Sequence, residues 1–259
     1  MSKEHKNYLK KIKSEKIIIK IIQILIILII IFIWQYAANK GLINTFVSSS
    51  PENILKTIIK LHKDGSLFHH IWITLYEVIV SFILGSTIGI VIAAILWRYN
   101  FIFKIIDPYL TVLNSMPKVS LGPIIIILAG ASTKSIIIMA LLISVIITII
   151  NMHQAFKETD KNKIRLLQSF NANKSQIFFK LILPSNFNNL INTFKVNIGL
   201  VFIGVIMGEF LVSKAGIGYL IMYGSQVFNL NLVMTGIIIL AVMASVMHYI
   251  IIFIEKKLF

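Results

Sequence analysis

The sequence predicts an all-α, polytopic membrane protein: a helical bundle with about six transmembrane helices. Of its 259 residues, 57% are hydrophobic and only 14% are charged, whereas soluble domains carry about a quarter charged residues. The apolar residues also come in runs close to the ~20 residues that cross a bilayer core. Cysteine is absent, which excludes disulfides and thiolate metal sites.

The first 16 residues form a basic arm, expected in the cytoplasm, and residues 17–259 form one membrane domain. The first span is expected from about Ile17 to Ala37, with Trp34 and Tyr36 at the membrane interface. No small-residue cleavage site follows this run, so it is expected to be a retained anchor and not a signal peptide.

A helix-start signal, Ser50-Pro51-Glu52, follows the first span. It predicts a short amphipathic helix over Asn53–Lys63, outside the bilayer core. The second span is expected from about Ile71 to Trp97. Within it, Gly85 and Gly89 are spaced to allow close contact with another helix.

The third hydrophobic region, about Phe101–Gly130, is broken by prolines, and irregular backbone at membrane depth must face protein or a wet cavity. Four residues beside the break are therefore candidates for a translocation path: Asn114, Ser115, Met116 and Pro117. Glu77 and Glu209 are two further candidates, because a carboxylate in an apolar span is costly. Each could instead lie near the interface, which is favoured for Glu209.

Three more spans are expected, over Ser135–Ile150, Leu190–Val212 and Leu232–Ile254. Lys195, in the fifth, is expected to extend to the membrane surface. The distribution of Lys and Arg favours six spans with both termini in the cytoplasm. The segment 37–70 weakens this contrast, since it lies on the opposite side yet also contains lysines. The net charge of +15 is explained by basic cytoplasmic loops on anionic lipid, and not by nucleic-acid binding.

The most informative segment is a basic loop at about residues 157–185, containing KIRLLQSFNANKSQIFFKLILP. Helical periodicity places Ile164, Leu166, Leu167 and Phe170 on one arc. Asn171 follows and is expected in the left-handed conformation that ends a helix. A second short helix is expected to run to Pro184. This pattern fits either a docking element or a helix lying among lipid headgroups.

The segment resembles the cytoplasmic loop of binding-protein-dependent ABC transporter permeases, whose pattern is E-A-A, three residues, Gly, nine residues, I-x-L-P. Arg165-Leu166-Leu167 occupy the E-A-A positions, Asn171 the glycine, and Ile182-Leu183-Pro184 the end of the pattern. The chain from about residue 47 also resembles the nitrate/sulfonate/taurine-type branch, in Met116-Pro117, Ser120-Leu121-Gly122-Pro123, and Glu209 with Gly216-Ile217-Gly218.

The resemblance implies the permease subunit of an ATP-driven importer in a bacterial plasma membrane. Two separate ATPase subunits would use ATP and Mg²⁺, an extracytoplasmic binding protein would deliver the solute, and two permeases would pair, expected as a homodimer. No cofactor is expected on this chain. The surface that couples to the ATPase would comprise Arg165, Leu166, Leu167, Gln168, Ser169, Phe170, Asn171, Ala172, Asn173 and Lys174, with Pro184 closing the loop. Leu167 and Phe170 would be its apolar anchors.

No catalytic constellation or phosphate-binding glycine loop occurs in the sequence. His62, His69 and His70 are too few for a convincing metal site. The alternative is a non-transporting membrane scaffold or assembly protein with an amphipathic docking loop. A secondary transporter is disfavoured, because ionisable pairs are sparse and no internal repeat is seen. The cargo stays open between small sulfonate-, nitrate- or taurine-like anions and vitamin precursors.

Overall fold

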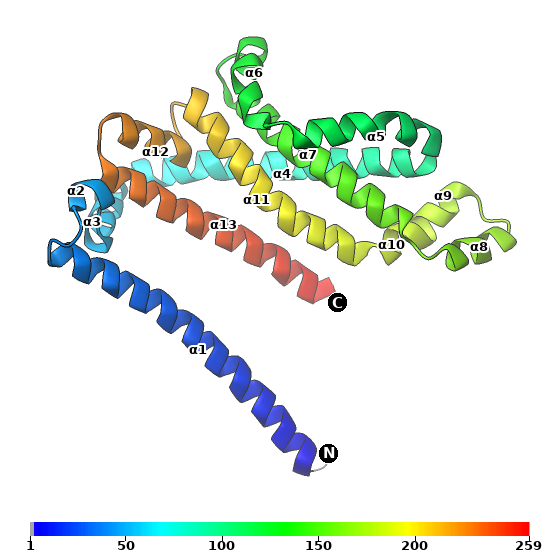
Figure 1. The fold of residues 1–259 in the computed structure, drawn as a ribbon, viewed down its shortest axis with the longest axis horizontal. Coiled ribbons are helices and arrows are strands. Elements are labelled where there is room, and N and C mark those ends of the chain that lie inside the picture. The colour runs from blue at the N-terminus through cyan, green and yellow to red at the C-terminus, as the bar shows by residue number, and fades with distance from the viewer. Residues whose placement is uncertain (1–2, 259) are drawn as a thin grey trace.

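The computed structural model describes the backbone of residues 3–258, and most side chains of the expected basic arm at residues 1–16 lie outside the described part. The described chain is helical throughout, which confirms the all-α prediction (Figure 1). Five helices are long and apolar enough to cross a membrane. They are α1 (Lys3–Asn39), α4 (Ser66–Arg98), α7 (Thr133–Lys157), α11 (Phe187–Val212) and α13 (Leu230–Leu258).

A bent helical pair lies between α4 and α7. It consists of α5 (Asn100–Ser115), the 3-10 helix η1 (Lys118–Leu121) and α6 (Gly122–Ala129), with a bend of 91°. The bend falls at Pro117. The preceding residue, Met116, has left the helix at φ −67° and ψ 141°, because a proline disfavours helical backbone before it. The expected break of the third span is therefore present.

Helices α4 and α7 pack in the same direction. A Cβ on Gly85 would collide with Ser144, and one on Gly89 would collide with Thr148. A step of four residues along α4 thus corresponds to a step of four residues in the same direction along α7, which means that the two helices are parallel. The small residues thus give the predicted close approach. Since α4 and α7 begin at the same end of the bundle, the bent pair must return the chain along it, which supports six passages.

The core lies where α7 passes between α4 and α11 (Figure 1). Its fully buried members include Val78 of α4, Ile136 and Ala140 of α7, and Val201 and Val205 of α11. The short helix α12 (Ile217–Gln226) packs on α11, α13 and α4. The packing of α4, α7, α11 and α12 around this core fixes the positions of the two ends of the bundle.

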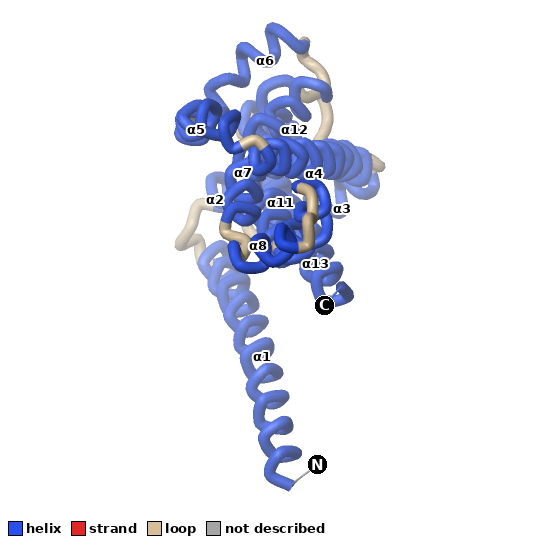
Figure 2. Tube along the Cα trace, turned by 90° about the vertical axis from the view of Figure 1, so that its right-hand side faces the viewer, coloured by secondary structure: helices blue, strands red, loops and turns tan. Residues whose placement is uncertain are grey.

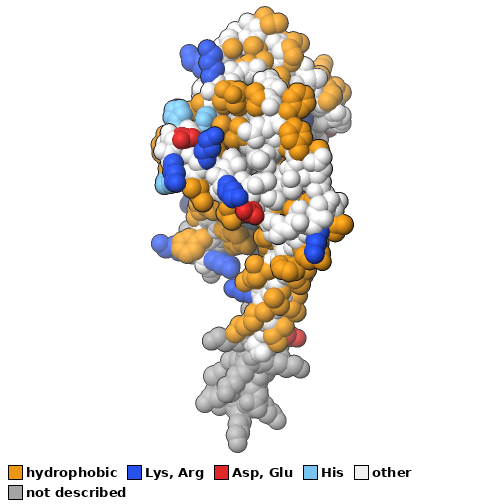
Figure 3. All heavy atoms as spheres, turned by 90° about the vertical axis from the view of Figure 1, so that its left-hand side faces the viewer, with side chains coloured by type: hydrophobic (Ala, Val, Ile, Leu, Met, Phe, Trp, Pro, Cys, Tyr) orange, Lys and Arg blue, Asp and Glu red, His pale blue; other side chains and the backbone are white. Residues whose placement is uncertain are grey.

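Two short helices connect α1 to α4: α2 (Thr45–Ser48) and α3 (Pro51–Lys63). Ser50 caps α3 by accepting a hydrogen bond from the Asn53 N–H at 3.2 Å, as the start signal predicted. Helix α3 packs against α13 and α4; Ile54 is buried, and Leu61 packs against the core. Its last turn carries Lys60, His62 and Lys63, and Figure 3 shows basic and histidine side chains gathered on one side of this end of the molecule.

Helix α1 stands apart from the rest of the bundle (Figure 2). None of the residues in its apolar part, Ile17–Asn39, is buried against the rest of the described structure, and only Trp34, Gln35, Ala37 and Ala38 are half-buried. Near its end, the Gln35 side chain accepts a hydrogen bond from the Glu52 N–H at 3.0 Å. This contact attaches α1 to the start of α3.

The loop between α7 and α11 contains α8 (Lys161–Ser169), α9 (Lys174–Ile177), the π-helix η2 (Phe178–Ile182) and α10 (Leu183–Ser185). The second helix ends at Ser185, one residue beyond its expected end at Pro184, so Pro184 lies in the last turn. Proline cannot donate the usual hydrogen bond, and its ring crowds the preceding turn. The wider π turn directly before Pro184 accommodates that ring.

Candidate functional site

The loop between α7 and α11 lies at one end of the bundle, and the short helix α12 lies at the opposite end (Figure 1). The elements α8, α9, η2 and α10 lie where α4 and α7 end. We call residues 161–185 the cassette. A cavity lies where α4 and α7 begin and α11 ends.

The turn between α8 and α9 has the hydrogen-bond pattern of a Schellman motif. Asn171 has φ +57°, and its N–H donates to the Gln168 carbonyl at 2.9 Å. The Ala172 N–H donates to the Leu167 carbonyl at 3.0 Å. These bonds satisfy carbonyls that the helix end leaves free. The prediction that Asn171 ends the first helix in a left-handed conformation is confirmed.

Asn173 starts the second helix with a capping box. Its side chain accepts from the Gln176 N–H, and the Gln176 side chain accepts from the Asn173 N–H, each at 2.8 Å. Helix α8 begins similarly, because Asp160 accepts from the Asn162 N–H at 2.8 Å. Both helices of the cassette thus have fixed beginnings, and the angle between them is set by local hydrogen bonds.

The apolar residues of α8 divide between two directions. Ile164 and Leu167 pack against the buried cluster beneath the cassette, while Leu166 is 57% exposed and Phe170 is 74% exposed. The prediction that all four share one apolar arc is therefore wrong for this helix. Since Leu167 contacts the protein itself, the exposed apolar pair is Leu166 and Phe170.

The cassette rests on a packed aromatic base. Phe178 of η2 contacts Phe156 of α7 and Trp97 of α4, with ring centroids 5.3 Å and 5.4 Å apart. Arg98, at the end of α4, donates to the Ser175 hydroxyl at 3.1 Å. These contacts join α9 and η2 to α4 and α7, and closely packed interiors of this kind transmit strain between the elements that they join.

Replacing Asn171 tests the turn directly. We expect Asn171→Gly to leave thermal stability nearly unchanged, because glycine adopts positive φ without strain. Asn171→Val should lower the free energy of unfolding by about 1–2 kcal/mol, since a branched side chain is strained in the left-handed region. Thermal unfolding of the purified variants in detergent measures both. Equal stability of the two variants would contradict the role of the turn.

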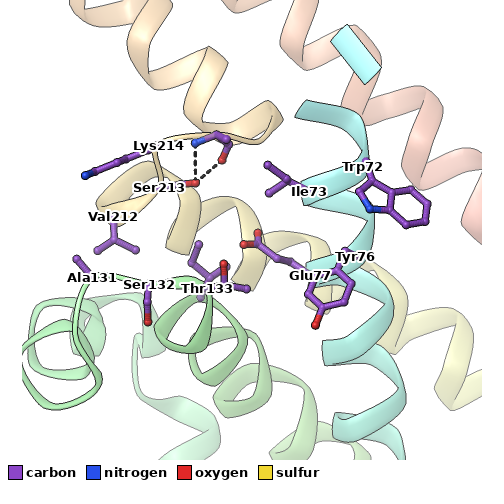
Figure 4. Close-up of a pocket in the computed structure, with 12 residues that line it drawn as sticks. Trp72, Ile73, Tyr76, Glu77, Ala131, Ser132, Thr133, Val212, Ser213 and Lys214 are labelled. Carbon is purple, nitrogen blue, oxygen red and sulfur yellow. Dashed lines mark hydrogen bonds between the residues drawn. The ribbon is translucent and has the colours of Figure 1, made fainter. Parts of the chain in front are cut away.

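At the opposite end, a cavity of about 670 Å³ opens among α4, α7 and the segment after α11 (Figure 4). Its lining comprises Trp72, Ile73, Tyr76, Glu77, Ala131, Ser132, Thr133, Ile136, Val212, Ser213, Lys214 and Ala215. Figure 4 shows the Glu77 carboxyl group directed into the space between α4 and the Val212–Ser213 segment, while the Lys214 side chain points away.

Glu77 is 1% exposed. Within residues 3–258, neither of its carboxyl oxygens has a hydrogen-bond partner, and Glu209 and Thr133 are the side chains that interact with it. An unpaired carboxylate at such a depth costs at least about 2.5–3.5 kcal/mol in a membrane protein. Ser81, Ser144 and Asn197 also have a buried side-chain oxygen without a hydrogen-bond partner among the described residues, but of these four side chains only Glu77 can carry a full charge.

Glu209 belongs to a satisfied network that holds the beginning of α12. Its carboxylate accepts hydrogen bonds from the Thr74 hydroxyl at 2.6 Å, from the Gly218 N–H, and from the Tyr219 N–H at 3.3 Å. The Thr74 oxygen also accepts from the Ile217 N–H at 2.8 Å. Glu209 is 1% exposed, so it is buried within the protein, and the expectation that it lies near the membrane interface stays a prediction.

His70 completes this network on α4. Its Nδ1 accepts from the Gly216 N–H at 3.0 Å, and its ring stacks on Tyr219 with centroids 6.0 Å apart. Gly216 has φ +114°, and a Cβ there would overlap the Glu209 carboxylate. The first four N–H groups of this turn are thus bound by His70, Thr74 and Glu209, which we call the α12 latch. A helix start buried without such partners would be unstable.

The other path candidates do not join this cavity. Asn114, Ser115, Met116 and Pro117 are all exposed at the bend between α5 and η1. Their role in a translocation path stays a prediction.

The Lys195 Nζ pairs with Glu255 near the end of α13 at 2.8 Å, and its expected reach to the membrane surface stays a prediction. His153 is buried and stacks on Phe103 with ring centroids 3.8 Å apart. Among the described residues, no group of three or more His, Asp or Glu is placed to hold a metal ion.

Sequence reasoning missed Thr74 and His70. They are one helical turn apart on α4, so they share a face, and Glu209 precedes a Gly-Ile-Gly turn. The sequence offered two signals for this network: a polar pair on one span, and an acid before a glycine turn on another. Their pairing across 135 residues could not be read from either signal alone.

Comparison with known proteins places the chain among transport proteins. The sequence model of the family described as "Binding-protein-dependent transport system inner membrane component" matches residues 85–259. The putative aliphatic sulfonates transport permease protein SsuC of Bacillus subtilis is 27% identical over 91% of this chain and 85% of its own length. The taurine transport system permease protein TauC of Escherichia coli is 19% identical over 83% and 80%.

One further relative differs in its named cargo. The formylaminopyrimidine transport permease protein ThiX of Halalkalibacterium halodurans is 24% identical over 72% of this chain and 74% of its own length. Among solved structures, a chain of the inward-facing MetNI methionine ABC transporter superposes with a TM-score of 0.67. It is 16% identical, and the match covers 76% of this chain and 98% of that chain. That likeness supports the fold.

Proposed function

The chain belongs to the family of binding-protein-dependent transport system inner membrane components, and from this premise we propose that it forms the translocation path of an importer and couples to its ATPase through the cassette. As the permease component, it lies in the inner membrane as a multi-pass protein. ATP hydrolysis belongs to a different subunit of such transporters. Two ATPase subunits, an extracytoplasmic binding protein and a second copy of this permease complete the proposed assembly.

The observation that carries the coupling role is the exposed apolar pair on α8. Leu166 and Phe170 are 57% and 74% exposed, while the residues beside them hold α8 firmly to the aromatic base. Large exposed apolar side chains on a rigid element are typical anchors of a protein interface. Because α8 is fixed to α4 and α7, closure of the ATPase subunits would move these spans and not only a loop.

The cargo we propose is a small sulfonate-, nitrate- or taurine-like solute or a vitamin precursor. Support comes from the named cargoes of the relatives, which are aliphatic sulfonates, taurine and formylaminopyrimidine. In the proposed cycle, ATP-driven closure opens the path toward the α12 end, the binding protein releases its cargo there, and hydrolysis returns the path to the cytoplasmic side. The proposed orientation places both termini and the cassette in the cytoplasm.

Single-cysteine labelling tests the orientation, because the chain has no cysteine of its own. Phe170 and Phe228 are each 74% exposed and lie at opposite ends of the bundle. In intact cells, a membrane-impermeant maleimide should label Phe228→Cys and not Phe170→Cys. Inverted membrane vesicles should give the reverse. Labelling of Phe170→Cys from outside the cell would refute the cytoplasmic placement of the cassette.

The same cysteine separates a docking element from a helix immersed in lipid headgroups. In the purified permease, the proposed function predicts rapid labelling of Phe170→Cys and protection once the ATPase subunit is added. A headgroup location predicts slow labelling that the ATPase does not change. In that case, the scaffold alternative with a lipid-surface helix would be favoured.

A further inference from the structure

We propose that the cavity beside Glu77 binds a protonated amine, with the Glu77 carboxylate as its counter-charge. This inference rests on the proposed function, because it assigns a chemical class of cargo to the path. It narrows the open range of cargoes to solutes that carry an ammonium group.

The first support is that the buried Glu77 carboxyl group is without hydrogen-bond partners among residues 3–258. Its side chain is 1% exposed, yet both oxygens are without a hydrogen-bond partner in the described part of the chain. Figure 4 shows the carboxyl group directed into the cavity. Buried carboxylates in proteins are hydrogen-bonded or paired with a cation, so this group is incomplete as it stands.

The second support is the charge balance around it. Glu209 lies beside Glu77, and its three hydrogen-bond donors are a hydroxyl and two backbone N–H groups, none of which carries a full charge. Two neighbouring buried carboxyl groups ionise together only when a cation lies between or beside them, and without such a cation one member keeps its proton. Neither glutamate forms an ion pair among the described residues. Lys214 borders the cavity but points away from it (Figure 4).

The third support is the fit of an ammonium group to the lining. A cavity of about 670 Å³ lies within the usual size of small-molecule sites. An ammonium group has three donors and no acceptor, which suits the Glu77 carboxylate and the neighbouring Thr133 hydroxyl. A divalent metal ion suits the site less, because no set of three possible ligand side chains surrounds it in residues 3–258.

The location also fits passage of a solute. The cavity is lined by residues of the first half of α4, the start of α7 and the end of α11, at the end of the bundle where Figure 1 shows α12, opposite α8 and α9 of the cassette. In the proposed orientation this is the side on which the binding protein releases its cargo. A cationic group arriving there would meet Glu77 before it reached the rest of the path.

The test uses two solutes that differ only in the amine. Taurine carries an ammonium group where isethionate has a hydroxyl, and both carry the same sulfonate. Ethylammonium serves as a second amine without the sulfonate. The full-length permease in lipid nanodiscs is titrated with each, and binding is read by equilibrium dialysis and by the shift in unfolding temperature. The variants are Glu77→Gln and, as a control carboxyl on the surface of α3, Glu52→Gln.

We expect taurine and ethylammonium to bind and to raise the unfolding temperature, and isethionate to do neither. Glu77→Gln should weaken amine binding by at least about tenfold, as loss of a buried counter-charge does, while Glu52→Gln should bind like the wild type. Equal binding of isethionate and taurine, undiminished binding by Glu77→Gln, or no binding of either amine would overturn the inference.

A parallel arm adds the ATPase subunit to the same nanodiscs. A permease that binds the ATPase but no amine refutes the amine site alone. A permease that does not bind the ATPase refutes the proposed function, whatever the titration shows. The two failures are therefore distinguishable in one preparation.

Discussion

Phe170→Asp abolishes co-purification of the ATPase subunit with the permease and, with it, ATP-driven uptake. Phe170 is 74% exposed at the end of α8, where it contributes little to the core of the permease itself. In the complex it would be buried, and a carboxylate in its place would be desolvated without a partner. Loss of a central apolar anchor costs about 2–4 kcal/mol of binding free energy, equivalent to roughly thirtyfold or more in affinity.

Phe228→Asp is the matched control. Phe228 is equally exposed, at 74%, but lies between α12 and α13 at the other end of the molecule. Its positive φ of 54° is one that aspartate tolerates. We expect this variant to retain the ATPase. If Phe170→Asp binds the ATPase as tightly as Phe228→Asp does, the cassette is not the coupling surface.

Glu209→Ala destabilises the permease by about 3–5 kcal/mol, the range for removal of one partner of a buried charged interaction. The substitution leaves the Thr74 hydroxyl without its acceptor and deprives the Gly218 and Tyr219 N–H groups of theirs. Each unsatisfied buried donor adds its own desolvation cost. Thermal unfolding in detergent measures the loss, and protease susceptibility of α12 should increase.

Two control variants separate the network from charge in general. Glu209→Gln keeps one carbonyl acceptor and should lose less stability than Glu209→Ala. Glu52 is fully exposed, and its pKa is lowered because its carboxylate accepts a hydrogen bond from Lys56 and is attracted by the charge of that lysine. Glu52→Ala should therefore leave the unfolding temperature almost unchanged. Equal effects of Glu209→Ala and Glu52→Ala would show that the α12 latch does not stabilise the fold.

The features that sequence reasoning predicted correctly depend on neighbours along the chain. The apolar runs set the long helices, Ser50 and Pro51 set the start of α3, and Asn171 sets the turn of the cassette. Each follows from composition or from hydrogen bonds within about five residues. The close approach at Gly85 was also predictable, because small residues four apart have a direct packing meaning.

The features that sequence reasoning did not predict involve partners far apart in sequence. Whether Leu167 faces a partner protein or the bundle depends on where η2 packs. The hydrogen bonds of Glu209 come from Thr74 and the start of α12, which lie on other helices. Lys195 acquires Glu255 only when α11 and α13 meet. In each case tertiary packing decided the environment, and a single sequence contains no record of that contact.

The parallel contact of α4 on α7 makes α4 a long rigid lever. Along α4, His70 lies about 22 Å and Thr74 about 16 Å from the crossing at Gly85, at 1.5 Å per residue. A tilt of about 5° at that crossing would displace these two residues by roughly 2 Å and 1.4 Å, enough to stretch their hydrogen bonds to α12 beyond bonding distance. A small rotation of α4, started at its Arg98 end, would therefore separate His70 and Thr74 from the beginning of α12 without unwinding any helix.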